Sequence, residues 1–430
     1  MSVNASCSML RSSSKVGPQW LLAAMLVLAA ANELAADVVT DWNELATTIG
    51  PMAQPNPLHQ SRAYAMTQAA VHDALNAIDR RYEAHAYGAA APADASPEAA
   101  VSAAAAGVLR ALFPGRQADI DAAYQSALAS VPDGDDKTAG IAVGEAAAGA
   151  VLALRSNDGA AQANVPYTEP PAPGVWEPTP PNFVPAVLPG WGEVTPFALA
   201  NGRQFRPDPP EYFFLPGEQY AAEYREVQDI GSMFSTTRTL EQSEIARFWY
   251  EGSQLGWNRI ARVIAAEKDL SLWENARLLA LVNFALADGY IAGLNIKYFY
   301  KFWRPVTAIH KGDTDGNAAT DADLSWAAFL VTPFSPDYPS THSVLGAAAA
   351  EVLRRFVGTD SVPFTMTSGA PFPGITRSFD SLSEAALENA NSRVWAGIHF
   401  RTPTTDGLHV GDKIGKFVFK HSLRPAKGRS

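Results

Sequence analysis

The chain has 430 residues, a length that predicts two packed units or one large two-lobed domain. Hydrophobic residues make up 47% and charged residues 18%, an ordinary balance for a soluble globular protein that excludes a disordered chain. The formal net charge of −11 repels polyanions at long range, so we expect no nucleic-acid partner. Any anion chemistry must therefore rest on a local cluster of basic residues.

Residues 1–36 predict an export signal. Arg11 and Lys15 precede an apolar run over 20–31, and small residues that suit a signal peptidase follow it. The run is shorter than the roughly 20 residues of a membrane-spanning helix, so we expect a secreted or periplasmic protein whose mature chain has no membrane span. An uncleaved anchor is the alternative. The only cysteine, Cys7, would leave with the signal, which excludes disulfides and thiolate chemistry.

Residues 37–165 predict an N-terminal helical region. From Leu58 to Tyr82 the apolar residues recur at intervals of three and four, the pattern of an amphipathic helix. We therefore expect helices stacked on helices in this part of the chain. Alanine-rich stretches, which form helices readily, follow over 99–112, 118–129 and 140–154.

Residues 166–216 predict an extended arm. They hold 14 of the 31 prolines, which excludes regular helix. Large aromatic rings recur along the segment, and a solvated linker has no use for them. We therefore expect the arm to be ordered, to pack across the helical body and to shield part of a pocket. The rings belong to Trp176, Phe183, Trp191, Phe197 and Phe205.

Residues 217–430 predict a C-terminal helical region that carries the chemistry. Few segments alternate as strands do, so the fold class expected for the chain is all-α, with two packed helical bundles and the proline-rich arm. Asp288 lies inside an apolar helical run and is expected to form a buried salt bridge. The helical patterns cover 239–269, 271–300, 340–356 and 383–395.

The first chemical motif places basic residues at helical spacing. On a helix, residues seven apart differ by about 20° in direction, so Lys297 and Arg304 would project from one face, with Lys301 close to the same stripe. Pro305 disfavours helix at the residue before it and so places Arg304 near a helix end. Taken alone, such a pair indicates a solvated basic face, but the neighbouring aromatic residues argue against full exposure.

The second motif, at 339–343, is the start of a helix. A Pro-Ser-Thr sequence before an apolar run is typical of a helix N-terminus, where free backbone N–H groups and the helix dipole favour a bound anion. Ser340 would act as a cap, an anion ligand or both. His342, in the first turn, would exchange a proton near neutral pH. Alone, this motif indicates an ordinary capped helix.

The third motif runs from Ser392 to Arg401. Arg393 offers a planar fork that suits two oxygens of an anion. Gly397 breaks the helix before His399 and leaves the imidazole on a turn. A lone histidine between Ile and Phe is more often a core residue than a ligand.

Together the motifs read Lys-x6-Arg-Pro, then Pro-Ser-x-His, then Ser-Arg-x5-His. In this order they resemble the signature shared by vanadium-dependent haloperoxidases and the type-2 phosphatidic acid phosphatase superfamily, which includes bacterial acid phosphatases. The resemblance covers about the last 140 residues. Val39 to Tyr82, the arm and 303–309 also resemble secreted bacterial haloperoxidase-like proteins.

The resemblance implies a cradle for a tetrahedral oxyanion. Lys297, Arg304 and Arg393 would neutralise its equatorial oxygens. Ser340 and the backbone of Thr341 would complete the cradle. Vanadate and the phosphoryl transition state share charge and five-coordinate geometry, so one cradle suits both.

The same resemblance implies the catalytic groups. His399 would bond the central atom, either as the single protein ligand of vanadium in a haloperoxidase or as the phosphorylated nucleophile in a phosphatase. His342 would be the acid or base, and Lys297 would also polarise peroxide.

Three positions depart from the pattern of these families. Thr341 stands where Gly is usual, and it keeps the backbone N–H. An Asp normally follows the last His by about four residues, but here the next acidic residue is Asp406, which leaves the orienting partner of His399 open. Ser335 stands where many haloperoxidases carry an aromatic residue or His linked to halide preference.

The leading hypothesis is a vanadium-dependent haloperoxidase with a vanadate cofactor, which uses hydrogen peroxide to oxidise halide and passes the product to an organic acceptor. The alternative is a secreted acid phosphatase that hydrolyses phosphomonoesters with the same residues and no cofactor. A third hypothesis is a non-enzymatic helical oxyanion-binding protein, although a plain anion binder needs no paired histidines. We allow for a homodimer in each case.

Overall fold

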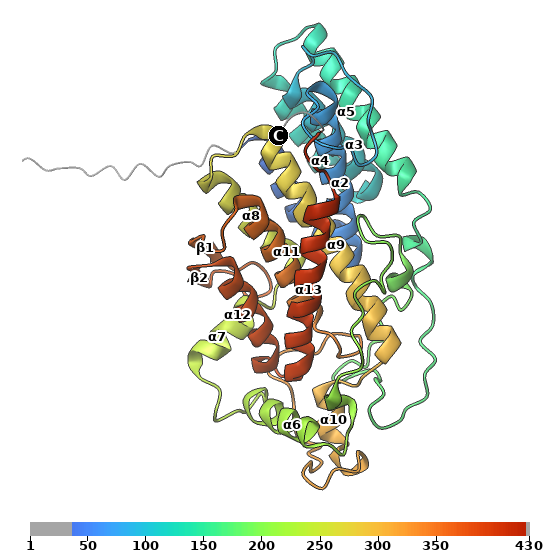
Figure 1. Cartoon of the computed structure of the whole chain (residues 1–430), viewed down its shortest axis with the longest axis vertical. Helices are drawn as coiled ribbons and strands as arrows, with labels where there is room; N and C mark the ends of the chain where they lie inside the picture. Colours follow the sequence, from blue (N-terminus) through green and yellow to red (C-terminus); the bar gives the residue numbers. More distant parts are fainter. Residues whose placement is uncertain (1–36, 427–430) are drawn as a thin grey trace, which may run out of the picture. The chain divides into compact units, whose positions relative to one another are not determined.

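The computed structural model describes residues 37–426, and the predicted export signal at 1–36 lies outside them. Helices dominate the described residues, and the two short strands, β1 (Phe364–Thr367) and β2 (Thr376–Phe379), pair antiparallel (Figure 1). The all-α fold class is confirmed. The α-helices are α1 (Val38–Ala53), α2 (Pro57–Ile78), α3 (Pro97–Leu112), α4 (Gln117–Ala129), α5 (Asp135–Leu154), α6 (Glu218–Ile230), α7 (Leu240–Phe248), α8 (Ser253–Glu267), α9 (Leu272–Tyr300), α10 (Pro305–His310), α11 (Thr341–Val357), α12 (Leu382–Trp395) and α13 (Arg401–His421).

Helix α9 lies between two groups of helices (Figure 1). It packs against α2, which packs on α3 and α5, and against α11, which packs on α12 and α13. A helix that is apolar all round must be covered on all sides. By length and composition α5 and α9 could cross a membrane, but the apolar stretch of α9 is 100% buried inside the fold and that of α5 is 33% buried. The helices thus form two bundles that share α9.

Close packing of α11 on α13 positions the second and third motifs. A Cβ added at Gly411 of α13 would lie 2.3 Å from the backbone oxygen of Val344 in α11. Only glycine allows the two helices to approach this closely. Near the start of α13, the Ser340 N–H donates to the Pro403 carbonyl over 2.9 Å. The N-terminus of α11 therefore lies beside that of α13.

The proline-rich arm is ordered and packs along α9 and the residues that follow it, as predicted. Trp176 is buried, and its N–H donates to the Lys301 carbonyl over 2.7 Å. Further along, the Val187 N–H donates over 2.9 Å to the carbonyl of Phe334, in the loop before α11. Phe183 is an exception to the expected packing, because it is 62% exposed.

Asp288, in the middle of α9, fastens the arm to the core. Its carboxylate is buried and accepts the backbone N–H groups of Phe197, Ala198 and Leu199 at 2.6, 2.8 and 2.9 Å. Backbone donors therefore take the place of the expected salt bridge. The charge of Arg155 adds an attraction.

The segment at 239–269 contains two helices where one was expected. Helix α7 ends at Phe248, and Gly252 is the extended N-cap from which α8 starts at Ser253. The break leaves the backbone of Glu251 free of a helix. Its carbonyl oxygen lies 3.1 Å from a ring nitrogen of His342.

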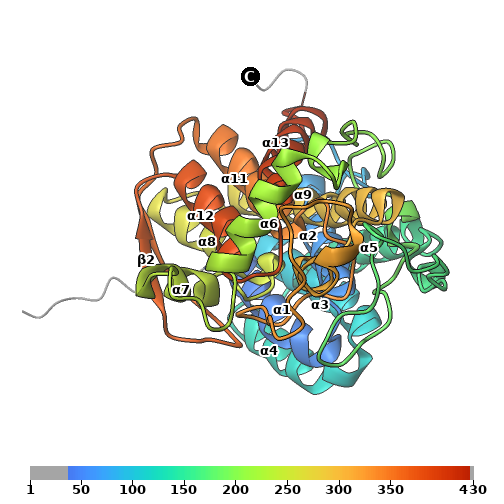
Figure 2. The ribbon, with the colours of Figure 1, turned by 90° about the horizontal axis from the view of Figure 1, so that it is seen from below.

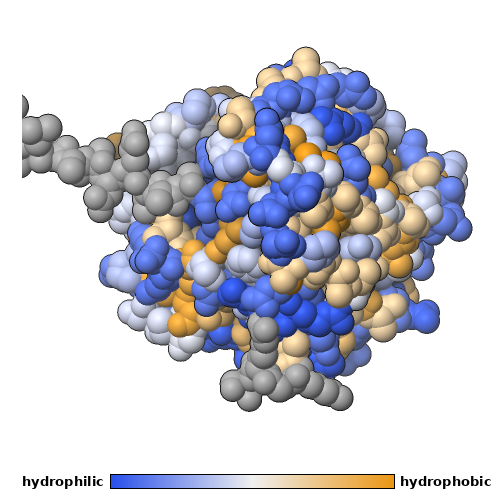
Figure 3. All heavy atoms as spheres, turned by 90° about the horizontal axis from the view of Figure 1, so that it is seen from above, coloured by the Kyte–Doolittle hydropathy of each residue, from blue (hydrophilic) through white to orange (hydrophobic). Residues whose placement is uncertain are grey.

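Helix α6 crosses one end of the second bundle. Seen from below, it runs across α12 and α13, and it also contacts α10 (Figure 2). Arg304 is the N-cap of α10 and Arg393 lies in the last turn of α12. Helix α6 therefore covers the end of the bundle at which these basic residues lie. At the opposite end, hydrophobic and hydrophilic residues alternate in small areas of the surface (Figure 3).

Candidate functional site

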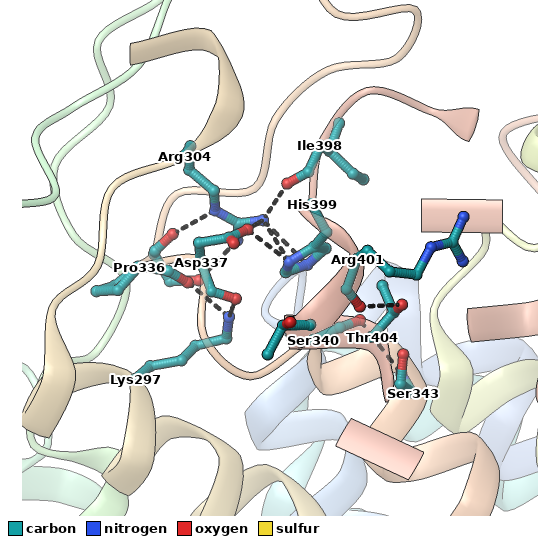
Figure 4. A network of polar contacts seen from close by, with 12 residues as sticks. Lys297, Arg304, Pro336, Asp337, Ser340, Ser343, Ile398, His399, Arg401 and Thr404 are labelled. Atoms are coloured by element: carbon teal, nitrogen blue, oxygen red, sulfur yellow. Dashed lines mark hydrogen bonds and ion pairs between the residues drawn. The ribbon is translucent and has the colours of Figure 1, made fainter. Parts of the chain in front are cut away.

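The three sequence motifs converge on one buried cluster. Lys297 comes from the last turn of α9, Arg304 is the N-cap of α10, and Arg393 lies in the last turn of α12. Figure 4 shows Lys297, Arg304 and His399 pointing toward one another. The three cations are each 1% exposed and His399 is 2% exposed. Tertiary structure thus brings together residues from separate elements.

The helical spacing from Lys297 to Arg304 is interrupted. Helix α9 ends at Tyr300, and Lys301 takes the left-handed conformation, with φ of 56°, that terminates the helix. The Lys301 side chain turns to Glu169 on the arm. The expectation of one helical face with three basic residues is therefore wrong. Lys297 and Arg304 meet through the turn after α9, and Lys301 lies outside the cluster.

Lys297 and Arg304 are fixed by the loop that leads into α11. The Lys297 Nζ donates to the carbonyl of Pro336 at 2.6 Å. The Arg304 Nε donates to the carbonyl of Ser335 at 2.7 Å, and Nη1 donates to that of Ile398 at 2.7 Å. Neutral carbonyls position both cations without cancelling their charge.

Burial makes the positive charge of the cluster costly. The pKa of Lys297 lies well below its usual value, first because of burial and then because of the charge of Arg304. Burial lowers the pKa of Arg304 and Arg393 to about 10, so both guanidinium groups stay charged at neutral pH. Among the acidic side chains that the structure describes, Asp337 alone is within ion-pair distance of these cations, 3.7 Å from Arg304. A bound anion would offset the remaining charge.

Arg393 keeps donors available for such an anion. Its Nη1 donates to the carbonyl of Trp249 at 3.2 Å, and its guanidinium carbon lies 5.5 Å from the centre of the Tyr250 ring. Its buried Nε has no hydrogen-bond partner within residues 37–426. A buried donor left unpaired costs about 1–3 kcal/mol, which an oxyanion would recover.

The N-terminus of α11 supplies the neutral part of the cradle. Ser340 is buried and is the N-cap, and its Oγ accepts the Ser343 N–H. Its hydroxyl proton is still able to donate to a ligand. The first N–H groups of the helix, from Thr341 onward, have no partner within the helix and carry the positive end of its dipole. Ser340 is therefore both a cap and a candidate ligand.

His342 lies in the first turn of α11 and is partly exposed. Its Nε2 is the nitrogen that faces the Glu251 carbonyl at 3.1 Å. Burial, and then the charge of Arg393, lowers the pKa of His342 well below its usual value. The ring is therefore neutral at pH 7 and able to accept a proton.

His399 lies on the turn between α12 and α13, where Gly397 has a φ of 76°, as predicted. The ring stands between two charged groups. Oδ1 of Asp337 is 2.7 Å from Nδ1, and Nη1 of Arg304 is 3.0 Å from Nε2. Burial, and then the charge of Arg304, lowers the pKa of His399 well below its usual value. The neutral ring keeps a lone pair on one nitrogen for a ligand.

Asp337 is a residue of the site that sequence reasoning missed. The family pattern pointed to an Asp after His399, but Oδ2 of Asp406 instead accepts the hydroxyl of Tyr338 over 2.7 Å. Asp337 belongs to the loop before Ser340 and is 0% exposed. The available signal was one acidic residue between prolines and aromatics, directly before the second motif.

Two sequence comparisons match parts of the chain. Residues 277–428 match the family model of the VCPO second helical-bundle domain, a range that contains the whole cluster. A vanadium chloroperoxidase from Curvularia inaequalis is 28% identical over 312 residues, a match covering 54% of this chain and 50% of that protein. The chain thus spans half the length of this curated relative.

Solved structures extend the likeness to most of the chain. A bacterial vanadium-dependent iodoperoxidase matches with a TM-score of 0.78 and 25% identity, over 91% of this chain and 97% of that one. A holo-type bacterial vanadium-dependent chloroperoxidase matches with a TM-score of 0.70 over 88% of this chain and 95% of that one. At 17% identity, this second likeness concerns the fold alone.

Proposed function

We propose that the chain oxidises halide with hydrogen peroxide through a vanadate cofactor, because residues 277–428 match the VCPO second helical-bundle domain and the fold resembles that of a bacterial vanadium-dependent iodoperoxidase. The observation that carries the proposal is the buried cluster of Lys297, Arg304 and Arg393. Its positive charge is only partly offset by Asp337.

The donor set of this cluster fits vanadate. The three cations, the Ser340 hydroxyl and the N–H groups at the start of α11 offer donors to several oxygens of one tetrahedral anion. His399 offers a neutral imidazole, a nitrogen ligand that suits first-row transition metals. Bound vanadate would supply a Lewis acid that activates peroxide toward halide.

The side chains then have separate tasks. His399 would bind the metal, the three cations would hold the oxygens, and Lys297 would also polarise peroxide. The oxidation of halide by hydrogen peroxide to hypohalous acid and water consumes one proton. We assign the delivery of that proton to His342, which is partly exposed beside the cluster.

A phosphatase would use the same residues, with His399 as nucleophile and His342 as the acid for the leaving group. The relatives found by sequence and by structure are named as vanadium haloperoxidases, and this favours the peroxidase. The pattern of residues 1–36 supports export, so we place the proposed activity in the periplasm or outside the cell.

The test is an assay of the purified protein with two arms. One arm measures halogenation of a phenolic dye by hydrogen peroxide with chloride, bromide or iodide, with and without orthovanadate. The other measures hydrolysis of a phosphomonoester without vanadate. We expect turnover only in the first arm and only with vanadate. Turnover confined to the second arm would show a phosphatase, and turnover in neither would leave an oxyanion-binding protein.

A matched pair of lysines sharpens this test. Lys297→Ala removes a buried cation of the cluster and should abolish most of the halogenation. Lys301→Ala, four positions along the chain, removes a cation that pairs with Glu169 outside the cluster and should leave halogenation unchanged. Equal loss in both variants would contradict the proposed site.

A further inference from the structure

Asp337 contacts the ring of the proposed metal ligand, His399. It lies in the loop between α10 and α11 and is 0% exposed. Its Oδ1 is 2.7 Å from Nδ1 of His399 and 3.7 Å from Nη1 of Arg304 (Figure 4). Neither oxygen receives a well-aligned hydrogen bond from the described residues, although the backbone N–H of Phe400 and the charge of Lys297 also lie close to the carboxyl group. Burial raises the pKa of Asp337 to about 7.

The two neighbours of His399 select one tautomer. When Asp337 is ionised, its oxygens accept only, so the ring nitrogen 2.7 Å from Oδ1 carries the proton. A guanidinium group donates only, and Nη1 of Arg304 lies 3.0 Å from Nε2 against 3.4 Å from Nδ1, so Nε2 is the nearer acceptor. The 2.7 Å contact of Asp337 with Nδ1 and the shorter of the two Arg304 contacts therefore assign the proton to Nδ1 and the lone pair to Nε2. The lone pair faces the cations of the cluster.

We propose that Asp337 is the positioning residue of His399, which holds Nδ1 protonated and so presents Nε2 to the metal of a bound vanadate. The inference rests on the proposed function. Histidines that bind metals are commonly oriented by a carboxylate on their other nitrogen, and loss of that carboxylate typically weakens metal binding by about 10- to 100-fold.

The position of this carboxylate in the chain is unexpected. The family pattern places the partner of the last His shortly after it, where this chain has Asp406. The Asp406 carboxylate instead accepts the hydroxyl of Tyr338, the residue next to Asp337. The loop before the second motif thus supplies the carboxylate that contacts His399.

The experiment uses the whole protein and two readouts. Without vanadate, long-range ¹⁵N–¹H correlation spectra of histidine-labelled protein report which ring nitrogen of His399 carries the proton, with His399→Gln for assignment. Calorimetric titration with orthovanadate then gives the dissociation constant. The variants are Asp337→Ala, Asp337→Asn and, as the matched control, Asp406→Asn.

We expect wild type to show the Nδ1–H tautomer and Asp337→Ala to lose it, with vanadate affinity weakened by about 10- to 100-fold. Asp337→Asn keeps an oxygen that accepts from Nδ1, so it should keep the tautomer with a smaller loss of affinity. Asp406→Asn should change neither readout. If Asp337→Ala does not fold, a several-fold loss in Asp337→Asn against no loss in Asp406→Asn decides for the proposal.

The inference is overturned if Asp337→Ala keeps the Nδ1–H tautomer and the wild-type affinity, or if Asp406→Asn weakens vanadate binding as much. Failure of the proposed function is distinguishable from this result. A wild-type protein that binds no vanadate but shows the Nδ1–H tautomer, lost in Asp337→Ala, would contradict the function and leave the positioning role of Asp337 intact.

Discussion

Gly293 of α9 faces Thr341 of α11 so closely that a Cβ added to the glycine would lie 2.8 Å from Cγ2 of the threonine. Thr341 therefore depends on a glycine in the facing helix. We predict that Gly293→Ala lowers the free energy of unfolding by about 1–3 kcal/mol through overpacking. Thr341→Gly in the same chain should restore it.

Urea unfolding of both variants checks this prediction. The control is Gly149→Ala on α5, where an added Cβ meets no atom within 4 Å. It should leave stability unchanged or raise it slightly. A double variant as unstable as Gly293→Ala alone would show that Thr341 is not the cause.

The contact of His342 with the Glu251 carbonyl determines which ring nitrogen carries the proton. The carbonyl of Glu251 only accepts, so Nε2 at 3.1 Å carries the proton and Nδ1 is the free base. We predict that His342→Ala lowers halogenation turnover by about 10²- to 10⁴-fold, the usual effect of losing a general acid or base. Vanadate affinity should stay near that of wild type. His409→Ala, whose side chain is 69% exposed, is the control and should keep full turnover.

Asp288 should control the attachment of the arm. Asp288→Asn replaces one acceptor oxygen with a donor that faces backbone N–H groups, so we expect a loss of about 1–3 kcal/mol in the free energy of unfolding. Limited proteolysis should then cut the chain between 166 and 216, a segment that we expect to resist cleavage in wild type. Unchanged resistance in the variant would mean that the aromatic contacts alone hold the arm.

The same residue predicts a pH dependence. Burial raises the pKa of Asp288 to about 6, against a value of about 3.9 in an unfolded chain. The folded protein therefore holds this proton more tightly, and the stabilisation from it is complete below pH 4 and is lost as the pH rises through 6. The stability of wild type relative to Asp288→Asn should fall over this window in urea unfolding. A rise would show that the three N–H donors outweigh burial.

Export predicts a defined mature N-terminus. If the pattern in residues 1–36 is a cleaved signal, mass spectrometry of secreted or periplasmic protein should find a chain that begins within a few residues of Ala36. An intact Met1 in the cytosol would contradict export.

Periodicity and proline content predicted much of the fold. They could not predict α13, because Pro403, Gly407, Gly411 and Gly415 are poor helix formers. Its glycines are instead required by close packing on α11, as Gly411 illustrates. Local sequence patterns therefore fail to predict a helix that is stabilised by tertiary contacts.

The site shows the same limit. Motif order located Lys297, Arg304, Arg393 and both histidines, since each sits in a recognisable local pattern. Helical spacing nevertheless predicted the wrong geometry for Lys297 and Arg304. The two side chains come together because the chain turns at Lys301, which has the left-handed conformation. Asp337 contacts His399 from a loop that is far from it in the sequence. No local sequence pattern predicts such a contact.

The most direct test of the whole account is equilibrium binding of orthovanadate to wild type and to His399→Ala. The variant keeps the three cations of the cluster but removes the nitrogen that we expect to bond the metal. Its affinity for vanadate should fall by more than the roughly 100-fold upper range seen when only a supporting partner is lost. Lys301→Ala should bind as wild type does. If His399→Ala binds vanadate as tightly as wild type, His399 is a core histidine and the proposed metal site is wrong.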